Sequence, residues 1–262
     1  MHKKNTVRAY EALLSRFYQD FGERSLDSLT SDQILGFLNE ITEGNKQQTK
    51  RIRYSHLSAF FNFIRTNIDT DFQNPCDNPI LRKMFRAKPM ISWDITEKDD
   101  IAEIIFRTEK PRNRLMLELM ARGGMRVGEV LKLRPRDVHD RKLTLRDPKS
   151  GKEREHVFIP QKVADRLKEY VRDKGIQPDQ KIFPICYEAA RTMVKKAGDT
   201  VGIRLRPHDL RRHAATYASR SGVPIEIVSK VILRHANLST TQIYLGKVPD
   251  TEAMRWIENL YA

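Results

Sequence analysis

The sequence predicts a mainly α-helical protein of two domains, a helical N-terminal domain over residues 1–88 and a mixed α/β domain with a small antiparallel sheet over residues 95–262. Apolar residues recur at helical spacing through most of the chain, as is typical of amphipathic helices. Residues 87–94, AKPMISWD, break this periodicity and contain a proline, so we place the linker there. In the second domain, two segments with strand-like alternation flank the turn-like DPKSGKER, which predicts a β-hairpin.

The N-terminal domain is expected to contain four helices. We expect Ser31 to cap the second helix and Gly44 to stop it, because a serine side chain satisfies free backbone N–H groups and glycine ends helices. The first turns of the third helix are basic, whereas its later turns are apolar. The four helices are residues 5–21, the segment between Ser31 and Gly44, residues 47–68 and residues 79–86.

The second domain is expected to combine several helices with the hairpin. Gly123 and Gly124 allow a tight turn directly before Arg126, which would start a short helix. The other expected helices are residues 97–107, 111–122, 161–174, 187–197 and 224–234, with a last one opening at residue 250, and the expected strands are residues 142–146 and 155–159.

The composition indicates a globular protein with a polyanionic partner. The chain has 262 residues, 39% of them hydrophobic, and a formal net charge of +14, which favours nucleic acid or an acidic membrane surface. No stretch approaches the roughly 20 apolar residues that span a membrane, and the N-terminus lacks a signal region, so we expect a cytoplasmic protein that binds nucleic acid. Cys76 and Cys186 lie too far apart in the sequence to indicate a disulfide framework or a structural zinc site.

Four residues with chemistry suited to a phosphodiester lie within about forty positions near the C-terminus: His208, Arg211, His235 and Tyr244. Pro207 suits a helix start, and the three-residue spacing of His208 and Arg211 places both on one helix face. Taken singly, each feature is ordinary: H-x-x-R is common on solvated helices, and a tyrosine among apolar neighbours usually packs in a core.

Together these residues resemble the motifs of the tyrosine recombinase, or phage-type integrase, family. The family pattern is H-x-x-R, then L-G-H or a variant, then a tyrosine nine positions later, and here it reads His208 to Arg211, Leu233-Arg234-His235 and Tyr244. The segment ARGGMRVGEV resembles the family's first arginine box, with Arg126 as the catalytic arginine and Glu129 as its supporting acid.

Two positions depart from the family pattern. Arg234 stands where many members have glycine, and His213 stands where a smaller or apolar residue is usual. Neither removes a catalytic group, but both bear on local backbone geometry and DNA contacts.

The resemblance implies site-specific DNA recombination through a 3′-phosphotyrosyl intermediate, in DNA integration or in the resolution of chromosome or plasmid dimers. Tyr244 would be the nucleophile, and Arg126 and Arg211 would clamp the non-bridging phosphate oxygens where transition-state charge develops. His208 would act as a base or hydrogen-bond donor and His235 as a further donor. Because the phosphotyrosyl ester retains the bond energy, neither a metal ion nor ATP is expected as cofactor.

The same resemblance implies a catalytic lysine on the β-hairpin that protonates the departing 5′ oxygen. Lys149, in the turn P-K-S-G, is our assignment, and Lys152 is its competitor on the same turn.

Double-stranded DNA is the implied partner, and the first domain resembles the family's core-binding domain. The residues expected to contact the DNA backbone are Lys50, Arg51, Arg53, Lys195 and Lys196. The apolar tail helix would either fold back on its own domain or dock on a neighbouring protomer, as the Xer-like resemblance implies for a tetramer on two DNA sites. A type IB topoisomerase-like relaxing enzyme and a catalytically inactive DNA-binding accessory protein are the alternative functions.

Overall fold

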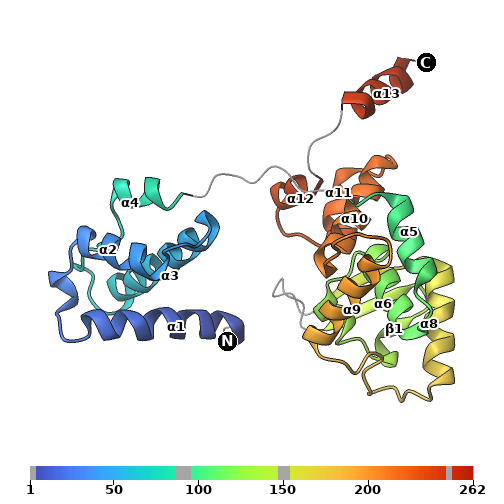
Figure 1. Cartoon of the computed structure of the whole chain (residues 1–262), viewed down its shortest axis with the longest axis horizontal. Helices are drawn as coiled ribbons and strands as arrows, with labels where there is room; N and C mark the ends of the chain where they lie inside the picture. Colours follow the sequence, from blue (N-terminus) through green and yellow to red (C-terminus); the bar gives the residue numbers. More distant parts are fainter. Residues whose placement is uncertain (1–3, 87–95, 147–153, 246–249, 262) are drawn as a thin grey trace. The chain divides into compact units, whose positions relative to one another are not determined.

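The computed structural model describes residues 4–86, 96–146, 154–245 and 250–261. Within these ranges the side chains of residues 4, 5, 243, 244, 251, 252, 260 and 261 are not described. The chain divides into two compact units, Met1–Pro89 and Met90–Ala262, each with its own hydrophobic core (Figure 1).

The first unit is a helical domain built around an aromatic core. Phe17 lies at its centre: its ring centroid is 5.4 Å from that of Phe37 and 5.7 Å from that of Phe61, both in edge-to-face geometry. Burial of each such ring contributes about 1.5–3 kcal/mol, which holds three helices together. The elements are α1 (Lys4–Phe21), η1 (Leu26–Ser28), α2 (Ser31–Ile41), α3 (Gln47–Asn67) and α4 (Pro79–Met84).

The cap of α2 differs from the sequence-based expectation by one residue. Thr30, not Ser31, is the N-cap: its hydroxyl accepts a hydrogen bond from the N–H of Gln33 at 3.3 Å, and the Gln33 side chain accepts from the Thr30 N–H at 3.0 Å. The Ser31 hydroxyl instead donates to the carbonyl of Pro75 at 2.9 Å. Because the Ser31 hydroxyl bonds to Pro75, 44 positions later in the chain, Thr30 is the residue that caps the helix.

The second unit consists of one small sheet and the helices that accompany it (Figure 1). Its strands, β1 (Val138–His139), β2 (Lys142–Arg146) and β3 (Arg154–Phe158), are antiparallel in the order β1-β2-β3. Leu143 pairs with Val157, and both are fully buried. The helices are α5 (Lys98–Arg107), α6 (Pro111–Ala121), α7 (Val127–Val130), η2 (Pro135–Asp137), α8 (Gln161–Asp173), α9 (Tyr187–Asp199), α10 (Pro207–Arg220), α11 (Ile225–Ile227), the π-helical η3 (Val228–Leu233), α12 (Leu238–Leu245) and α13 (Asp250–Tyr261). The predicted fold class is confirmed.

Helix α6 is the central element of this unit. Its residues Leu115 to Ala121 are all buried, and α8 and α10 both pack against it. Glu118 is a fully buried charge on this helix, and the guanidinium of Arg166 on α8 pairs with its two oxygens at 2.5 and 3.1 Å. A buried carboxylate needs such pairing, so this bridge fixes α8 against α6. Helix α10 therefore packs against a helix, α6, that this salt bridge holds in place against α8.

The helical segment expected over residues 224–234 is present, but most of it is π-helical. The segment forms a short α11 followed by the π-helical η3, and Arg234 ends it with φ +51° and ψ +48°, in the left-handed region. Apolar periodicity does not distinguish α from π winding, because both leave one face buried.

Candidate active site

Three segments far apart in the sequence meet at the side chain of Arg211, which projects from α10 and is fully buried. One terminal nitrogen of its guanidinium donates to the carbonyl of Gly124, and the other donates to the carbonyl of Leu233. Arg211 thus ties the turn before α7 to the turn after η3. A buried guanidinium requires acceptors of this kind.

Glycine is required at position 124 for two reasons. Its φ is +60°, a conformation that other residues rarely adopt. In addition, a Cβ atom there would lie 2.8 Å from Cγ2 of Ile232 and 2.9 Å from its carbonyl oxygen. The glycine turn therefore lets the first arginine box approach the η3 segment closely.

Arg126 and Glu129 form a pair at the start of α7. The backbone N–H of Arg126 donates to one Glu129 oxygen at 2.8 Å, and its guanidinium donates to the other at 2.7 Å. Arg234 donates to Glu129 from a different segment, also at 2.7 Å. Burial by itself would raise the pKa of Glu129, but the charge of Arg234 and the hydrogen bonds from Arg126 lower it overall. Glu129 is therefore ionised, and the side chain of Arg126 remains 28% exposed.

The two histidines lie close to the arginines: His208 is one turn before Arg211 on α10, and His235 directly follows Arg234, which donates to Gly124 and Glu129. His208 is exposed at its surface, but desolvation by the surrounding protein, together with the charges of Arg212 and Arg211, lowers its pKa to about 4. Partial burial together with the charges of Arg211 and Arg126 lowers the pKa of His235 to about 4. Both imidazoles are consequently neutral at pH 7 in the absence of DNA.

A hydrogen-bonded chain connects His235 to α12. Nδ1 of His235 lies 3.0 Å from the hydroxyl of Thr241, which donates to the hydroxyl of Ser229 at 2.8 Å. Thr241 is fully buried, and it belongs to α12, the helix that includes Tyr244. These hydrogen bonds hold α12 against the turn at residues 233–235, the histidine turn.

The side chains of the predicted catalytic lysine and of the predicted nucleophile Tyr244 are outside the described part of the chain. Lys149 and its competitor Lys152 fall within residues 147–153, between the described strands β2 and β3, and the side chain of Tyr244 is also not described. Their assigned roles stay predictions.

The predicted DNA-binding residues of the first unit lie at the start of α3. Arg51 is exposed, and Lys50 is half-buried. Arg53 is also half-buried, and its guanidinium donates to the carbonyl of Ala9 at 3.4 Å, which joins α3 to α1. Arg53 thus has a structural contact, and Lys50 and Arg51 are the better placed of the three for a ligand.

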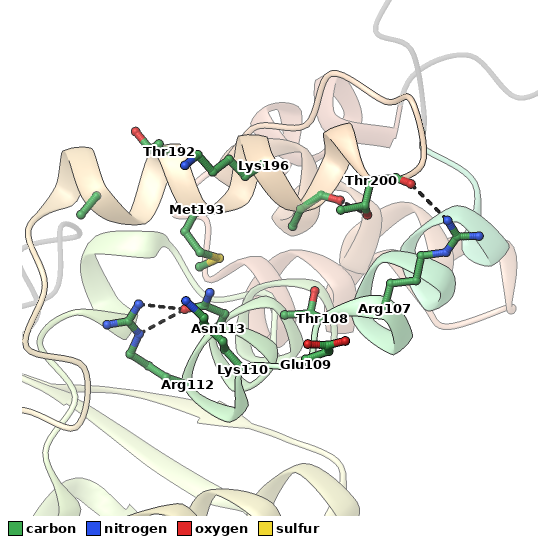
Figure 2. Close-up of a pocket in the computed structure, with 12 residues that line it drawn as sticks. Arg107, Thr108, Glu109, Lys110, Arg112, Asn113, Thr192, Met193, Lys196 and Thr200 are labelled. Atoms are coloured by element: carbon green, nitrogen blue, oxygen red, sulfur yellow. Dashed lines mark hydrogen bonds between the residues drawn. The ribbon is translucent and has the colours of Figure 1, made fainter.

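The predicted residues of the second unit, Lys195 and Lys196, are exposed on α9. Lys196 lines a pocket of about 510 Å³ between α9 and the turn that joins α5 to α6. Figure 2 shows Lys196 on the α9 side, Lys110 and Arg112 on the opposite side, and Arg107 at one end, where it donates to the carbonyl of Thr200. None of Arg126, His208, Arg211 and His235 lines this pocket. It is a cationic pocket separate from those four residues.

Sequence reasoning missed the roles of Ser229, Thr241 and Arg234. No sequence signal distinguishes Ser229 or Thr241 from surface hydroxyls, because their burial depends on long-range packing. Arg234 did carry a signal, since an arginine stands where the family often has glycine. The other departure, His213, is buried and its Nδ1 lies 3.2 Å from the carbonyl of Thr96.

The described residues contain no group of three or more His, Cys, Asp or Glu side chains that could hold a metal ion. None of their helices has the length and apolar character that crossing a membrane requires.

The chain matches two family descriptions. Residues 95–249 match the phage integrase family, and residues 2–67 match the phage integrase N-terminal SAM-like domain.

Curated relatives match along most of the chain. The tyrosine recombinase XerA of Pyrococcus furiosus is 30% identical over 258 residues, covering 92% of this chain and 83% of that protein. A tyrosine recombinase of Pseudothermotoga lettingae is 31% identical over 261 residues, covering 93% of this chain and 88% of that protein.

Solved structures share the fold. The XerH site-specific recombinase bound to palindromic difH substrate in a post-cleavage complex is 22% identical, with a TM-score of 0.73, covering 98% of this chain and 80% of that one. The Tn1549 transposon integrase in complex with transposon right end DNA is 17% identical, with a TM-score of 0.72, covering 100% of this chain and 95% of that one. With the first arginine box, the H-x-x-R segment of α10 and the histidine turn brought together, the chain belongs to the phage integrase family, the family of the tyrosine recombinases.

Proposed function

We propose that this site-specific DNA recombinase cuts and rejoins strands through a covalent bond between Tyr244 and a 3′ phosphate. The phenolic oxygen attacks phosphorus, the bond from phosphorus to the 5′ oxygen breaks, and the released 5′ oxygen takes a proton. A 5′ hydroxyl from another strand then reverses these steps. The observation that carries the proposal is the meeting of Arg126, Arg211 and the two histidines, with the Tyr244 helix hydrogen-bonded to one of them.

Arg126 is the group we assign to the non-bridging oxygens of the phosphate. Its side chain is partly exposed, whereas that of Arg211 is fully buried and holds two backbone carbonyls. Two of the five N–H donors of the Arg211 guanidinium hold these carbonyls, and we assign its positive charge to the phosphate together with Arg126. Preorganised cations of this kind are worth most where charge develops in the transition state.

His208 is the group we assign to the phenolic proton, and DNA binding adjusts its basicity. Desolvation is the largest cause of its low pKa, about 4, and the charges of Arg212 and Arg211 lower it further. A bound phosphate is negative and opposes those charges, so the pKa rises on binding. His208 thereby becomes a better base when the substrate is present. His235 donates to the phosphate, and Lys149 protonates the 5′ oxygen.

A covalent adduct tests this function without knowledge of the target sequence. A pool of nicked duplexes with a randomised core releases a short fragment on cleavage, which leaves the protein attached to DNA. We expect wild type to trap DNA from this pool, with EDTA present, and repeated recovery to converge on one sequence. Cleavage that disappears with EDTA and returns with magnesium would exclude this mechanism.

DNA affinity is expected to depend on the start of α3. Lys50→Ala should weaken binding to the selected duplex and reduce the slope of log affinity against log salt by about one unit, because one phosphate contact is lost. Lys168→Ala is the matched control, since Lys168 is exposed on α8 and pairs with Asp140 at 2.6 Å. An unchanged slope for Lys50→Ala in a salt titration would show that this helix does not face DNA.

The tail helix α13 supports the proposal of assembly through the C-terminus. A Cβ atom at Gly222 would lie 3.0 Å from the ring of Trp256, so this ring packs near the end of α10. Met254 and Ile257, by contrast, are 69% and 59% exposed. Because exposed apolar side chains on one helix are suited to a protein interface, we assign them to a neighbouring protomer in a tetramer on two DNA sites.

Removing the tail is expected to affect assembly more than folding. A chain ending at residue 249 should melt cooperatively and bind a single site, but lose cooperative binding to paired sites in a gel-shift titration. Met254→Asp combined with Ile257→Asp should reproduce that loss with the contact of Trp256 intact. Normal cooperativity in both proteins would rule out exchange of the tail between subunits.

A further inference from the structure

Arg234 occupies an unusual position for an arginine. It stands directly before His235 with φ +51°, a conformation that costs free energy for any residue with a Cβ atom. Its side chain is only 4% exposed. Glycine would adopt this backbone without strain, so the arginine side chain must supply something that glycine lacks.

The side chain bridges three segments of the second unit. Its guanidinium donates to Glu129 at 2.7 Å, to the carbonyl of Ile232 at 2.8 Å and to that of Gly124 at 3.4 Å. Its Nε lies 3.5 Å from a carboxylate oxygen of Glu155, which is buried on β3. The histidine turn, the first arginine box and the β-hairpin are therefore joined through one buried cation.

The contact with Glu129 bears on the catalytic arginine. Glu129 takes one charged hydrogen bond from Arg126 and one from Arg234. If Arg234 were absent, the Glu129 carboxylate would be balanced by Arg126 alone among the partners described here. A carboxylate that fully neutralises Arg126 reduces the attraction of its guanidinium for phosphate. Sharing the carboxylate keeps Arg126 free to bind phosphate.

We propose that Arg234 is a positioning residue for strand cleavage: it shares the charge of Glu129 so that Arg126 can bind the phosphate, and it fixes β3 to the turn that carries His235. The inference rests on the proposed function, because it concerns the same site. It predicts that Arg234 acts on the rate of cleavage through Glu129 and much less on DNA affinity.

The test measures adduct formation in a single turnover at saturating selected duplex, together with DNA affinity and thermal melting. Arg234→Gly keeps the backbone conformation and removes the guanidinium. We expect cleavage to slow about 10- to 100-fold, the scale for partners that orient a reactive group, with affinity within about twofold. Arg234→Asn is the second variant, because asparagine also tolerates the left-handed region.

A double-mutant cycle separates positioning from a structural role. In the Glu129→Gln background the carboxylate charge is gone, so Arg234→Gly should slow cleavage by no more than about threefold further. A loss of the same size in both backgrounds, or cleavage by both Arg234 variants at the wild-type rate, would overturn the inference. The inference would also be overturned if the two substitutions were additive in the cleavage rate and non-additive only in the melting temperature. If wild type itself forms no adduct, the proposed function fails, and the inference fails with it.

Discussion

Arg126→Ala and Arg211→Ala should both slow DNA cleavage by about 100- to 1,000-fold, the cost of removing one preorganised donor. The two variants are expected to differ in stability. Arg126→Ala should leave stability nearly unchanged, because its side chain is partly exposed and Glu129 keeps its bond to Arg234. Arg211→Ala should also lower the free energy of unfolding by about 2–5 kcal/mol, because it removes the Arg211 donor from two buried carbonyls and opens a cavity; the Gly124 carbonyl keeps only the 3.4 Å bond from Arg234.

Urea unfolding and single-turnover cleavage on the selected duplex distinguish the two arginines. DNA affinity should change little in Arg126→Ala, since the interaction with phosphate is assigned to the transition state. Arg126→Lys is the matched variant: it keeps the charge and loses the planar fork, so it should recover only part of the rate. Equal destabilisation by both alanine variants would contradict the different burial of the two side chains.

Tyr244→Phe is expected to abolish the covalent adduct and retain DNA binding. Phenylalanine preserves the ring and removes only the oxygen that attacks phosphorus, so no other group can take over the bond. A gel shift should give wild-type affinity while denaturing electrophoresis shows no attached DNA. Thr241→Val is an informative companion, because it removes the hydroxyl that links α12 to His235. It should slow adduct formation without abolishing it.

The helical elements could be predicted because their signals are local. The apolar spacing of α1 and α3, and the alternation of β2 and β3, reflect which face each element buries. The catalytic motifs were also local, since H-x-x-R and L-x-H occupy consecutive residues. A resemblance that depends on short segments is readable without a structure.

Features that depend on distant partners could not be predicted. Arg53 was expected to face DNA, but the carbonyl of Ala9 lies within its reach, and no local pattern in α3 indicates that contact. Arg234 was noticed only as an exception to a glycine, because Glu129 and Glu155 lie 105 and 79 positions earlier in the sequence. Sequence spacing says nothing about such pairs.

Burial within the catalytic motif was likewise beyond the sequence. His208 and Arg211 share one face of α10, yet His208 is exposed and Arg211 is fully buried. The difference arises from the turns at Gly124 and Leu233, which close over the longer side chain and supply its acceptors. The sequence proposes the residue types of the candidate site, and the structure distinguishes their surroundings.

The most direct test of the central claim is to identify the residue that carries the DNA. The wild-type adduct is trimmed with nuclease, digested with protease and analysed by mass spectrometry, which locates the attached nucleotide on a peptide. The account predicts a nucleotide joined through its 3′ phosphate to the phenolic oxygen of Tyr244. A nucleotide attached to any other residue, or attached through a 5′ phosphate, would contradict it.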